Sequence, residues 1–194
     1  MNVGVALFAN RQVADECDPA AAQSRLKKVN IMASRSRMRD SIKFVIAVAF
    51  PLVVGGLSGF STSRGVETWY PTLAKPSFNP PSWVFGPVWT TLYILMGIAA
   101  FFVWRKGFAR EGVKFALSLF VVQLSLNGLW SIVFFGLQWP GWAVVEIALL
   151  WLTIVATLIA FWRVTTAAGW LLVPYLAWVS FAAVLNGSIW MLNR

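Results

Sequence analysis

From residue 44 onward the chain alternates between long apolar stretches and shorter polar connections. Each stretch approaches the roughly 20 helical residues that are needed to cross a hydrocarbon core about 30 Å thick. The five stretches are residues 44–60, 83–104, 113–137, 142–162 and 170–192. They are apolar throughout, whereas a transmembrane β-strand alternates apolar and polar residues. The pattern therefore predicts an all-α integral membrane protein, a five-helix bundle within residues 42–194.

The first 41 residues have a different pattern. Charged residues, Ala and Ser mix there without helical periodicity, which predicts a basic, disordered N-terminal tail. The apolar run before Arg11 is too short for a secretory signal. Four acidic residues in this segment argue against a mitochondrial presequence. Met32 and Met38 leave open an over-extended start or a targeting extension.

Composition supports a membrane protein and excludes several kinds of chemistry. Of the 194 residues, 59% are hydrophobic and only 12% are charged, whereas about 25% are charged in soluble domains. The chain has no histidine and a single cysteine, Cys17. These two facts exclude zinc sites built on histidine, Ser-His-Asp catalysis, His-ligated haem and an internal disulfide. We therefore expect no bound metal and no required cofactor.

The distribution of charge predicts the orientation of the bundle. The formal net charge is +9, but eight of the sixteen Lys and Arg residues lie within the first 43 positions. With the N-terminus inside, thirteen cationic residues fall on the inner side and three on the outer side. The positive-inside rule thus predicts an N-in, C-out topology, and the clustering indicates topology instead of nucleic-acid binding. The first connection and the C-terminus then share the outer face.

That first connection, residues 61–82, is the longest and is dense in proline. Its distinctive residues are Trp69, Lys75, Pro76, Pro80 and Pro81. Proline restricts the backbone of its own residue and of the preceding one, so this segment predicts a stiff lid. An ordinary interfacial connector with belt tryptophans is the alternative. Asn79 before Pro80 also predicts the N-cap of the second helix.

Three of the predicted helices each combine tryptophan with polar or small residues on one face. The sets are Trp89, Tyr93 and Met96; Asn127, Trp130 and Ser131; and Trp178, Ala182 and Asn186. Together they predict a cavity lined by indole rings, suited to a flat and mostly apolar ligand such as a tetrapyrrole or a sterol. Alternatively, the two asparagines join helices while the tryptophans pack or face lipid. The chain has twelve tryptophans, all between Trp69 and Trp190.

Two further features fit structural roles. Glu146, the one acidic residue expected inside a span, is interpreted as a snorkelling or capping carboxylate near the start of the fourth helix. Gly55 and Gly59 form a GxxxG pattern that allows close helix packing, either within the chain or in a dimer.

In their order along the chain, these motifs resemble the TspO/MBR family of tryptophan-rich sensory and translocator proteins, the peripheral-type benzodiazepine receptors. The resemblance rests on Trp69-Tyr70, Lys75-Pro76, Asn79-Pro80-Pro81, Trp89, Asn127-x-x-Trp130-Ser131-x-x-Phe134-Phe135, Pro174-Tyr175-x-x-Trp178 and Leu185-Asn186. It extends from about Ile42 to Asn193.

The resemblance implies a membrane receptor or sensor that binds porphyrins such as protoporphyrin IX or haem and regulates tetrapyrrole or stress responses. The ligand-binding residues that it implies are Tyr70, Trp89, Asn127, Trp130, Ser131, Trp178 and Ala182. It further implies a homodimer in lipid, and leaves two alternatives open. One is light- and oxygen-dependent porphyrin breakdown, with Trp89 and Trp178 as catalytic residues; the other is a carrier of porphyrin, sterol or lipid.

This chain departs from the family pattern in two places. The tail is longer than in most bacterial members, and no tyrosine lies between Asn186 and Arg194, which breaks the sterol motif of animal members. A bacterial-type porphyrin function in the cytoplasmic membrane is therefore expected, with a mitochondrial or bacterial outer membrane as the alternative.

Overall fold

The computed structural model describes residues 19–194 and shows helices as the only long elements in that range. The main helices are α2 (Pro19–Thr68), α3 (Phe85–Trp104), α4 (Val113–Ser131), α5 (Pro140–Val164) and α6 (Thr166–Leu192). Short 3₁₀ turns cover Tyr70–Thr72 and Ser82–Val84, and a π-helical turn, Ile132–Gly136, continues α4. No strand occurs within these described residues. The chain divides into two compact units, Met1–Ile42 and Lys43–Arg194.

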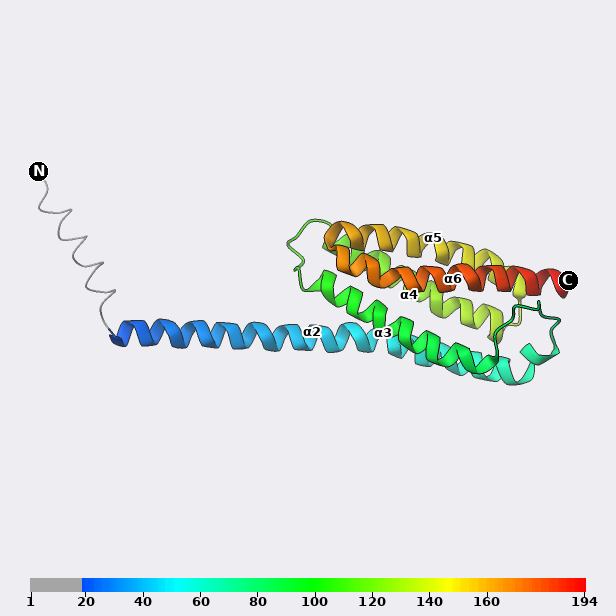
Figure 1. Cartoon of the computed structure of the whole chain (residues 1–194), viewed down its shortest axis with the longest axis horizontal. Coiled ribbons are helices and arrows are strands. Elements are labelled where there is room, and N and C mark those ends of the chain that lie inside the picture. Colours follow the sequence, from blue (N-terminus) through cyan, green and yellow to red (C-terminus); the bar gives the residue numbers. More distant parts are fainter. Residues whose placement is uncertain (1–18) are drawn as a thin grey trace, which may run out of the picture. The chain divides into compact units, whose positions relative to one another are not determined.

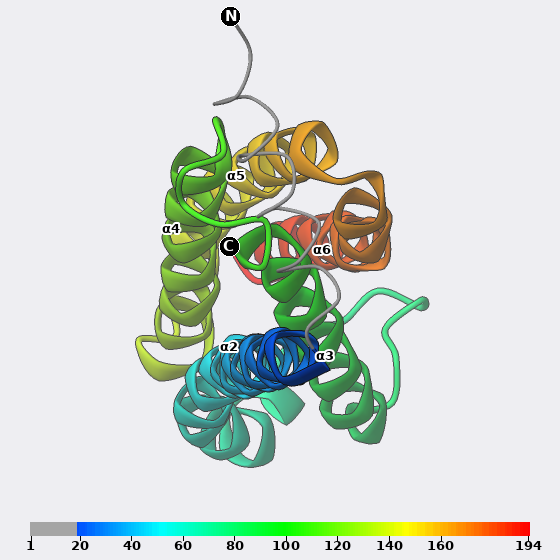
Figure 2. The same ribbon diagram turned by 90° about the vertical axis from the view of Figure 1, so that its left-hand side faces the viewer.

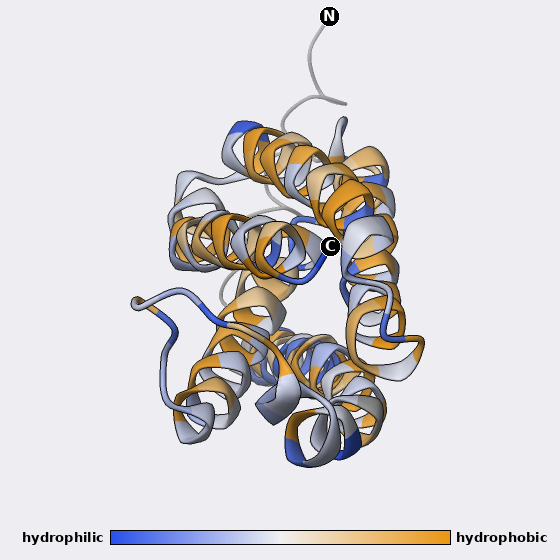
Figure 3. Cartoon of the chain, turned by 90° about the vertical axis from the view of Figure 1, so that its right-hand side faces the viewer, coloured by the Kyte–Doolittle hydropathy of each residue, from blue (hydrophilic) through white to orange (hydrophobic). Residues whose placement is uncertain are grey.

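The prediction of five transmembrane helices is confirmed. All five helices contain a window long and apolar enough to cross a membrane. In the second unit, α3 to α6 and the adjoining part of α2 run side by side as a bundle (Figures 1 and 2). Apolar residues make up much of the helices in this bundle (Figure 3). Large ones such as Leu149, Leu152 and Ile159 are exposed on α5. Such a surface suits lipid, in which exposed apolar side chains carry no cost.

Small residues set the closest helix contacts in the bundle. Gly97 of α3 lies against the backbone of Ala47 and Val48, so closely that a Cβ at position 97 would fall 2.6 Å from the Val48 Cα. Gly55 of α2 faces the ring of Tyr93, and no side chain larger than hydrogen fits there without displacing that ring. Packing within the chain therefore explains Gly55, the first glycine of the GxxxG pattern. A Cβ at Gly59 would meet no atom within 4 Å.

The first helix differs most from its predicted bounds. It begins at Pro19 and ends at Thr68, whereas the sequence predicted residues 44–60 and a disordered tail before them. Residues 20–33 contain many strong helix formers (Ala, Arg, Leu, Lys, Gln and Met) and no internal proline or glycine. Side chains 23–39 are all exposed, so the segment lacks the apolar periodicity that the prediction relied on. The part of the predicted tail before Pro19 lies outside the described residues.

The start of α3 also corrects the prediction. Pro81 has an extended backbone (φ −57°, ψ 141°), so helical geometry begins only at the turn Ser82–Val84 and α3 begins at Phe85. Asn79 is not the N-cap of this helix. Its side chain instead accepts a hydrogen bond from Tyr70. Between the π-helical turn and α5 the chain turns at residues 137–139, where Gln138 adopts a left-handed conformation (φ 59°).

Candidate functional site

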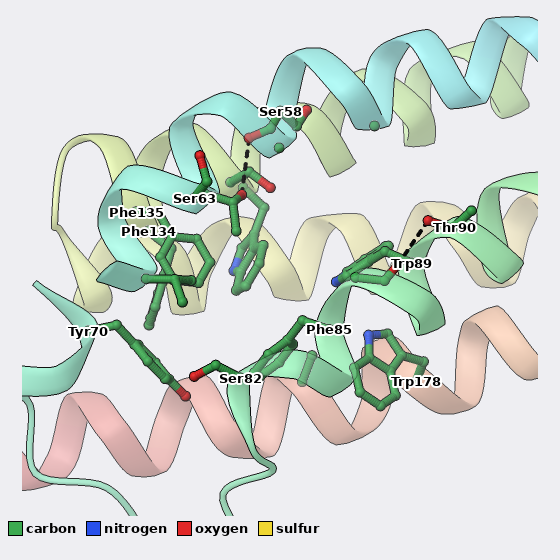
Figure 4. Close-up of a pocket in the computed structure, with 18 of the residues that line it drawn as sticks. Ser58, Ser63, Tyr70, Ser82, Phe85, Trp89, Thr90, Phe134, Phe135 and Trp178 are labelled. Atoms are coloured by element: carbon green, nitrogen blue, oxygen red, sulfur yellow. Dashed lines mark hydrogen bonds between the residues drawn. The ribbon is translucent and has the colours of Figure 1, made fainter. Parts of the chain in front are cut away.

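A cavity of about 520 Å³ lies within the second unit, between α2, α3, α4 and α6 (Figure 4). Most of its surface is apolar, and aromatic rings supply much of the wall. The aromatic lining residues are Tyr70, Phe85, Trp89, Tyr93, Trp130, Phe134, Phe135 and Trp178. Small and hydroxyl residues of α2, among them Gly56, Gly59 and Thr62, complete it. A volume in the range of roughly 300–1,000 Å³ is typical of sites for small organic ligands.

The aromatic rings hold one another in place around this cavity. Trp89 stacks on Tyr93 with ring centroids 5.6 Å apart, and Trp130 stacks on Phe134 at 5.3 Å. Phe85 meets Trp178 edge to face at 6.1 Å. Because each ring is supported by a neighbour, the wall is preorganised for a flat ligand that would stack on it.

The two indoles from α4 and α6 differ in their hydrogen bonds. The Nε1 of Trp130 donates to Asn186 Oδ1 at 3.1 Å, and the Asn186 amide in turn donates to the carbonyl of Pro140 at 3.1 Å. The Nε1 of Trp178 is buried and has no hydrogen-bond partner among the described residues. A buried N–H without a partner costs free energy, so Trp178 is suited to donate to an acceptor on a ligand.

Six of the seven residues predicted to bind ligand line this cavity: Tyr70, Trp89, Trp130, Ser131, Trp178 and Ala182. The seventh, Asn127, is 1% exposed and lies outside the set of described residues that form the wall. It accepts a hydrogen bond from the Tyr93 hydroxyl (2.6 Å) and donates to the Tyr175 hydroxyl (3.2 Å). Tyr175 donates to Gln123 Oε1 at 2.9 Å, so the network joins α3, α4 and α6. Asn127 therefore orients Tyr93 and acts on the cavity through it.

The proline-dense loop lies at one end of the bundle, and only residues near its two ends line the cavity. Tyr70 and Ser82 line the cavity, whereas Trp69, Lys75, Pro76, Pro80 and Pro81 are outside the described residues that do. The Tyr70 hydroxyl donates to Asn79 Oδ1 at 2.5 Å, and the Lys75 ammonium lies 5.0 Å from the centre of the Tyr70 ring. Tyr70 is 3% exposed, and this desolvation raises the pKa of its hydroxyl to about 12, so the hydroxyl remains a donor throughout the neutral range.

The loop is also tied to the C-terminal end of α6. The Asn193 side chain accepts from the Ala74 N–H and donates to the Ala74 carbonyl, both at 2.9 Å. The first loop and the C-terminus thus lie at the same end of the bundle, as the sequence predicted (Figure 1). Which side of a membrane this end faces stays a prediction.

Replacing Asn193 by alanine should loosen this loop. Loss of the acceptor leaves the Ala74 amide without its side-chain partner, and we expect its hydrogen exchange to accelerate by about 10-fold, the equivalent of roughly one hydrogen bond. Hydrogen exchange measured by mass spectrometry checks this. Ser188→Ala is the control, because Ser188 bonds only to its own helix at Val184. Unchanged exchange at Ala74 in Asn193→Ala would show that the loop is held by other contacts.

Glu146 does not lie where the sequence predicted. It is in the second turn of α5, 8% exposed, and neither carboxylate oxygen has a hydrogen-bond partner among the described residues. The prediction of a snorkelling or capping carboxylate is therefore wrong. Because α5 starts at Pro140 and buries Ala143, Glu146 and Ile147 on one face, Glu146 points into the bundle.

We predict that Glu146→Leu stabilises the protein by about 1–2 kcal/mol, because leucine removes a buried carboxyl group that has no partner. Thermal unfolding in detergent, followed by tryptophan fluorescence, measures the change. Glu67→Leu, at an exposed position of α2, is the control and should change stability little. A lower melting temperature for Glu146→Leu would mean that the carboxyl group has a stabilising contact in solution.

Several residues that line the cavity were not predicted from the sequence. Phe85 lies one turn before Trp89 on the same face, a spacing that could have identified it. The wall contributed by α2, from Leu52 to Glu67, carried no such signal, because glycine, serine and threonine are also common where helices simply pack together. No group of three His, Cys, Asp or Glu side chains that could hold a metal occurs among the described residues.

Comparison with known proteins identifies the family of this chain. The model of the TspO/MBR family matches residues 47–191. The chain belongs to the TspO/MBR family. It is 45% identical to the tryptophan-rich protein TspO of Chlorobaculum tepidum over 155 residues, which cover 80% of this chain and 98% of that protein. It is 43% identical to the translocator protein of Sus scrofa over 154 residues (76% and 90%). It is 39% identical to the tryptophan-rich sensory protein of Cereibacter sphaeroides over 152 residues (78% and 90%).

Membership of the TspO/MBR family agrees with the resemblance predicted from the motifs. The matched region contains every described residue that lines the cavity, whereas the helical segment before residue 43 lies outside it. The chain is therefore a membrane protein of a family whose members include sensory and translocator proteins. The long N-terminal segment needs a separate explanation.

Proposed function

We propose that this TspO/MBR protein is a membrane receptor that binds a porphyrin, such as protoporphyrin IX, in the aromatic cavity between α2, α3, α4 and α6. The observation that carries the proposal is the cavity itself, about 520 Å³ in volume and walled by rings from α3, α4, α6, the π-helical turn and the turn at Tyr70. Flat conjugated ligands gain offset stacking on such walls, and a small aliphatic ligand would leave them without partners.

Polar groups around the cavity supply orientation. The free Trp178 Nε1 can donate to one acceptor of the ligand, and Thr62, Ser63 and Ser131 add hydroxyl groups to the lining. No lysine or arginine is among the described lining residues, and the one charged lining residue is the exposed Glu67. The apolar macrocycle is therefore expected in the cavity, with its two propionates directed towards the solvated edge, where their charge remains hydrated.

Haem and metal-free protoporphyrin IX should bind with affinities within about 3-fold of each other, because the described lining has no histidine, cysteine or methionine and its two tyrosine hydroxyls, of Tyr70 and Tyr93, are already bonded to Asn79 and Asn127. The chain has no histidine, and Met96 is fully buried with its Sδ 3.9 Å from Gln123 Nε2. Titrations with the two ligands, each followed by its Soret absorbance, compare them directly. Haem binding tighter by more than an order of magnitude would reveal an iron ligand and contradict the assignment of this cavity.

The proposed receptor function has a direct test. Purified protein reconstituted in lipid should bind protoporphyrin IX saturably, and protein with the cavity filled by Ala182→Trp should not. Val184→Trp is the control on α6, since Val184 is 61% exposed and outside the described cavity lining. Equal binding by both variants would place the ligand elsewhere. Porphyrin turnover under light, sterol binding and homodimer formation stay predictions that this test does not address.

A further inference from the structure

The part of α2 before residue 43 carries a row of cations on one face. Arg25, Lys28, Arg35 and Arg39 recur at steps of three, seven and four residues, with Met32 filling the one gap at the regular spacing. At 3.6 residues per turn these five positions fall on a single stripe along the helix. We call it the cationic stripe. All five side chains are exposed.

The stripe has little compensating charge. Residues 23–42 contain six Lys and Arg residues and one acid, Asp40. Two of the six cations, Lys27 and Arg37, lie off the stripe on other faces of the helix. Four cations in one row along a helix repel one another. A surface of this kind favours the binding of a polyanion, which relieves that repulsion.

We propose that the cationic stripe binds the headgroups of anionic lipids at the membrane surface. The chain enters its first apolar stretch at residue 44, directly after this segment, so the stripe is tethered next to a bilayer at a high effective concentration of headgroups. Clusters of four to eight cations beside a membrane span are the usual pattern for such binding.

Apolar side chains in and beside the stripe favour lipid over other polyanions. Met32 and the neighbouring Val29 are 57% and 60% exposed. At a bilayer surface these side chains can enter the boundary between headgroups and acyl chains while the flanking cations contact phosphate. If the stripe bound a nucleic acid, the side chains of Met32 and Val29 would face charged phosphates and would gain no apolar contact. This inference is independent of the porphyrin cavity, because it uses no residue of the cavity.

A fluorescent label on the stripe tests the proposal in the full chain. Cys17 is the only cysteine, so Cys17→Ser followed by Met32→Cys allows an environment-sensitive NBD label at the centre of the stripe. Ser34→Cys gives the same label on the opposite side of the helix. In vesicles of phosphatidylcholine with about 30% phosphatidylglycerol, the label at 32 should be brighter and blue-shifted relative to pure phosphatidylcholine. The label at 34 should not change, and about 0.5 M NaCl should reverse the effect at 32.

Two double variants separate the stripe from total charge. Lys28→Gln with Arg35→Gln removes two stripe cations, and Lys27→Gln with Arg37→Gln removes the same residue types from other faces. Glutamine is a good helix former, so both variants keep the helix. We expect the stripe variant to reduce the ratio of bound to free segment by about 10-fold and the matched variant by less than about 3-fold.

Three results would overturn the proposal. Equal emission of the label at 32 in the two kinds of vesicle would exclude binding to anionic lipid. An equal loss of binding in the two double variants would show that binding depends on the net charge of the segment and not on the position of the cations in the stripe. A response in phosphatidylcholine vesicles to added duplex DNA or to inorganic phosphate, with none to phosphatidylglycerol, would identify a different anion as the ligand.

Discussion

Replacing Trp89 and Trp178 together by alanine is expected to weaken protoporphyrin IX binding by about 100-fold, since stacking on one aromatic side chain contributes roughly 1–3 kcal/mol. Trp89 is supported by Tyr93 and Trp178 by Phe85, so both rings are held at the cavity wall before a ligand arrives. Their loss removes stacking surface, and neither indole takes part in the hydrogen bonds of Asn127 to Tyr93 and Tyr175, although Trp89 packs on both of these rings. Titration of each variant, followed by the porphyrin Soret band, measures the change.

The matched control removes two tryptophans from the outside of the bundle. Trp142 and Trp170 are 67% and 61% exposed and lie outside the described cavity lining. The double alanine variant at these positions should bind with nearly the affinity of the wild type. Trp178→Phe keeps a ring and removes the free Nε1, so an intermediate loss of about 10-fold is expected if that N–H donates to the ligand. Wild-type affinity in the Trp89 and Trp178 double variant would refute the site.

Gly97→Ala should destabilise the bundle by about 2–3 kcal/mol, because the added methyl group has no space. Its Cβ would lie 2.6 Å from the Val48 Cα and 2.8 Å from the Ala47 carbonyl oxygen. Both are backbone atoms, so α2 and α3 must move apart to accept it. The contact lies on the same two helices that form one side of the cavity, so porphyrin affinity should fall as well.

Gly187→Ala provides the comparison for this variant. Gly187 is inside α6, and a Cβ there would meet no atom within 4 Å. Alanine at this position should be neutral or stabilise by up to about 1 kcal/mol through its helix propensity. Chemical or thermal unfolding in detergent compares the two variants with the wild type. Equal stability of Gly97→Ala and Gly187→Ala would contradict the close contact between α2 and α3.

The sequence predicted the parts of this protein that depend on composition and on helical spacing. Long apolar runs have one solution in a bilayer, so the number of spans and their approximate bounds followed directly. Helical spacing also indicated that Trp89, Trp130 and Trp178 lie on helix faces that could form one cavity, and all three line it. Family resemblance added Tyr70, which lies in a loop and has no periodicity of its own.

What the sequence could not supply depended on contacts between helices. A sequence does not distinguish a buried asparagine that faces a cavity from one that bonds to a hydroxyl group of another helix. Asn127 was therefore predicted to line the cavity, whereas it bonds to Tyr93 and Tyr175. Glu146 was assigned to the interface because the rotation of α5 about its axis is set by packing. The helix was not predicted from Pro19 because residues 23–39, whose side chains are all exposed, show no apolar periodicity in the sequence.

The most direct test of the receptor proposal is a titration of the wild-type protein with protoporphyrin IX in the dark, followed by tryptophan fluorescence. With Trp89, Trp130 and Trp178 all at the cavity, we predict strong quenching that saturates at about one porphyrin per chain. The variant that lacks Trp89 and Trp178 should show little saturable quenching over the same range. Quenching that rises without saturation, and equally in both proteins, would indicate partition into detergent and would contradict porphyrin binding in this cavity.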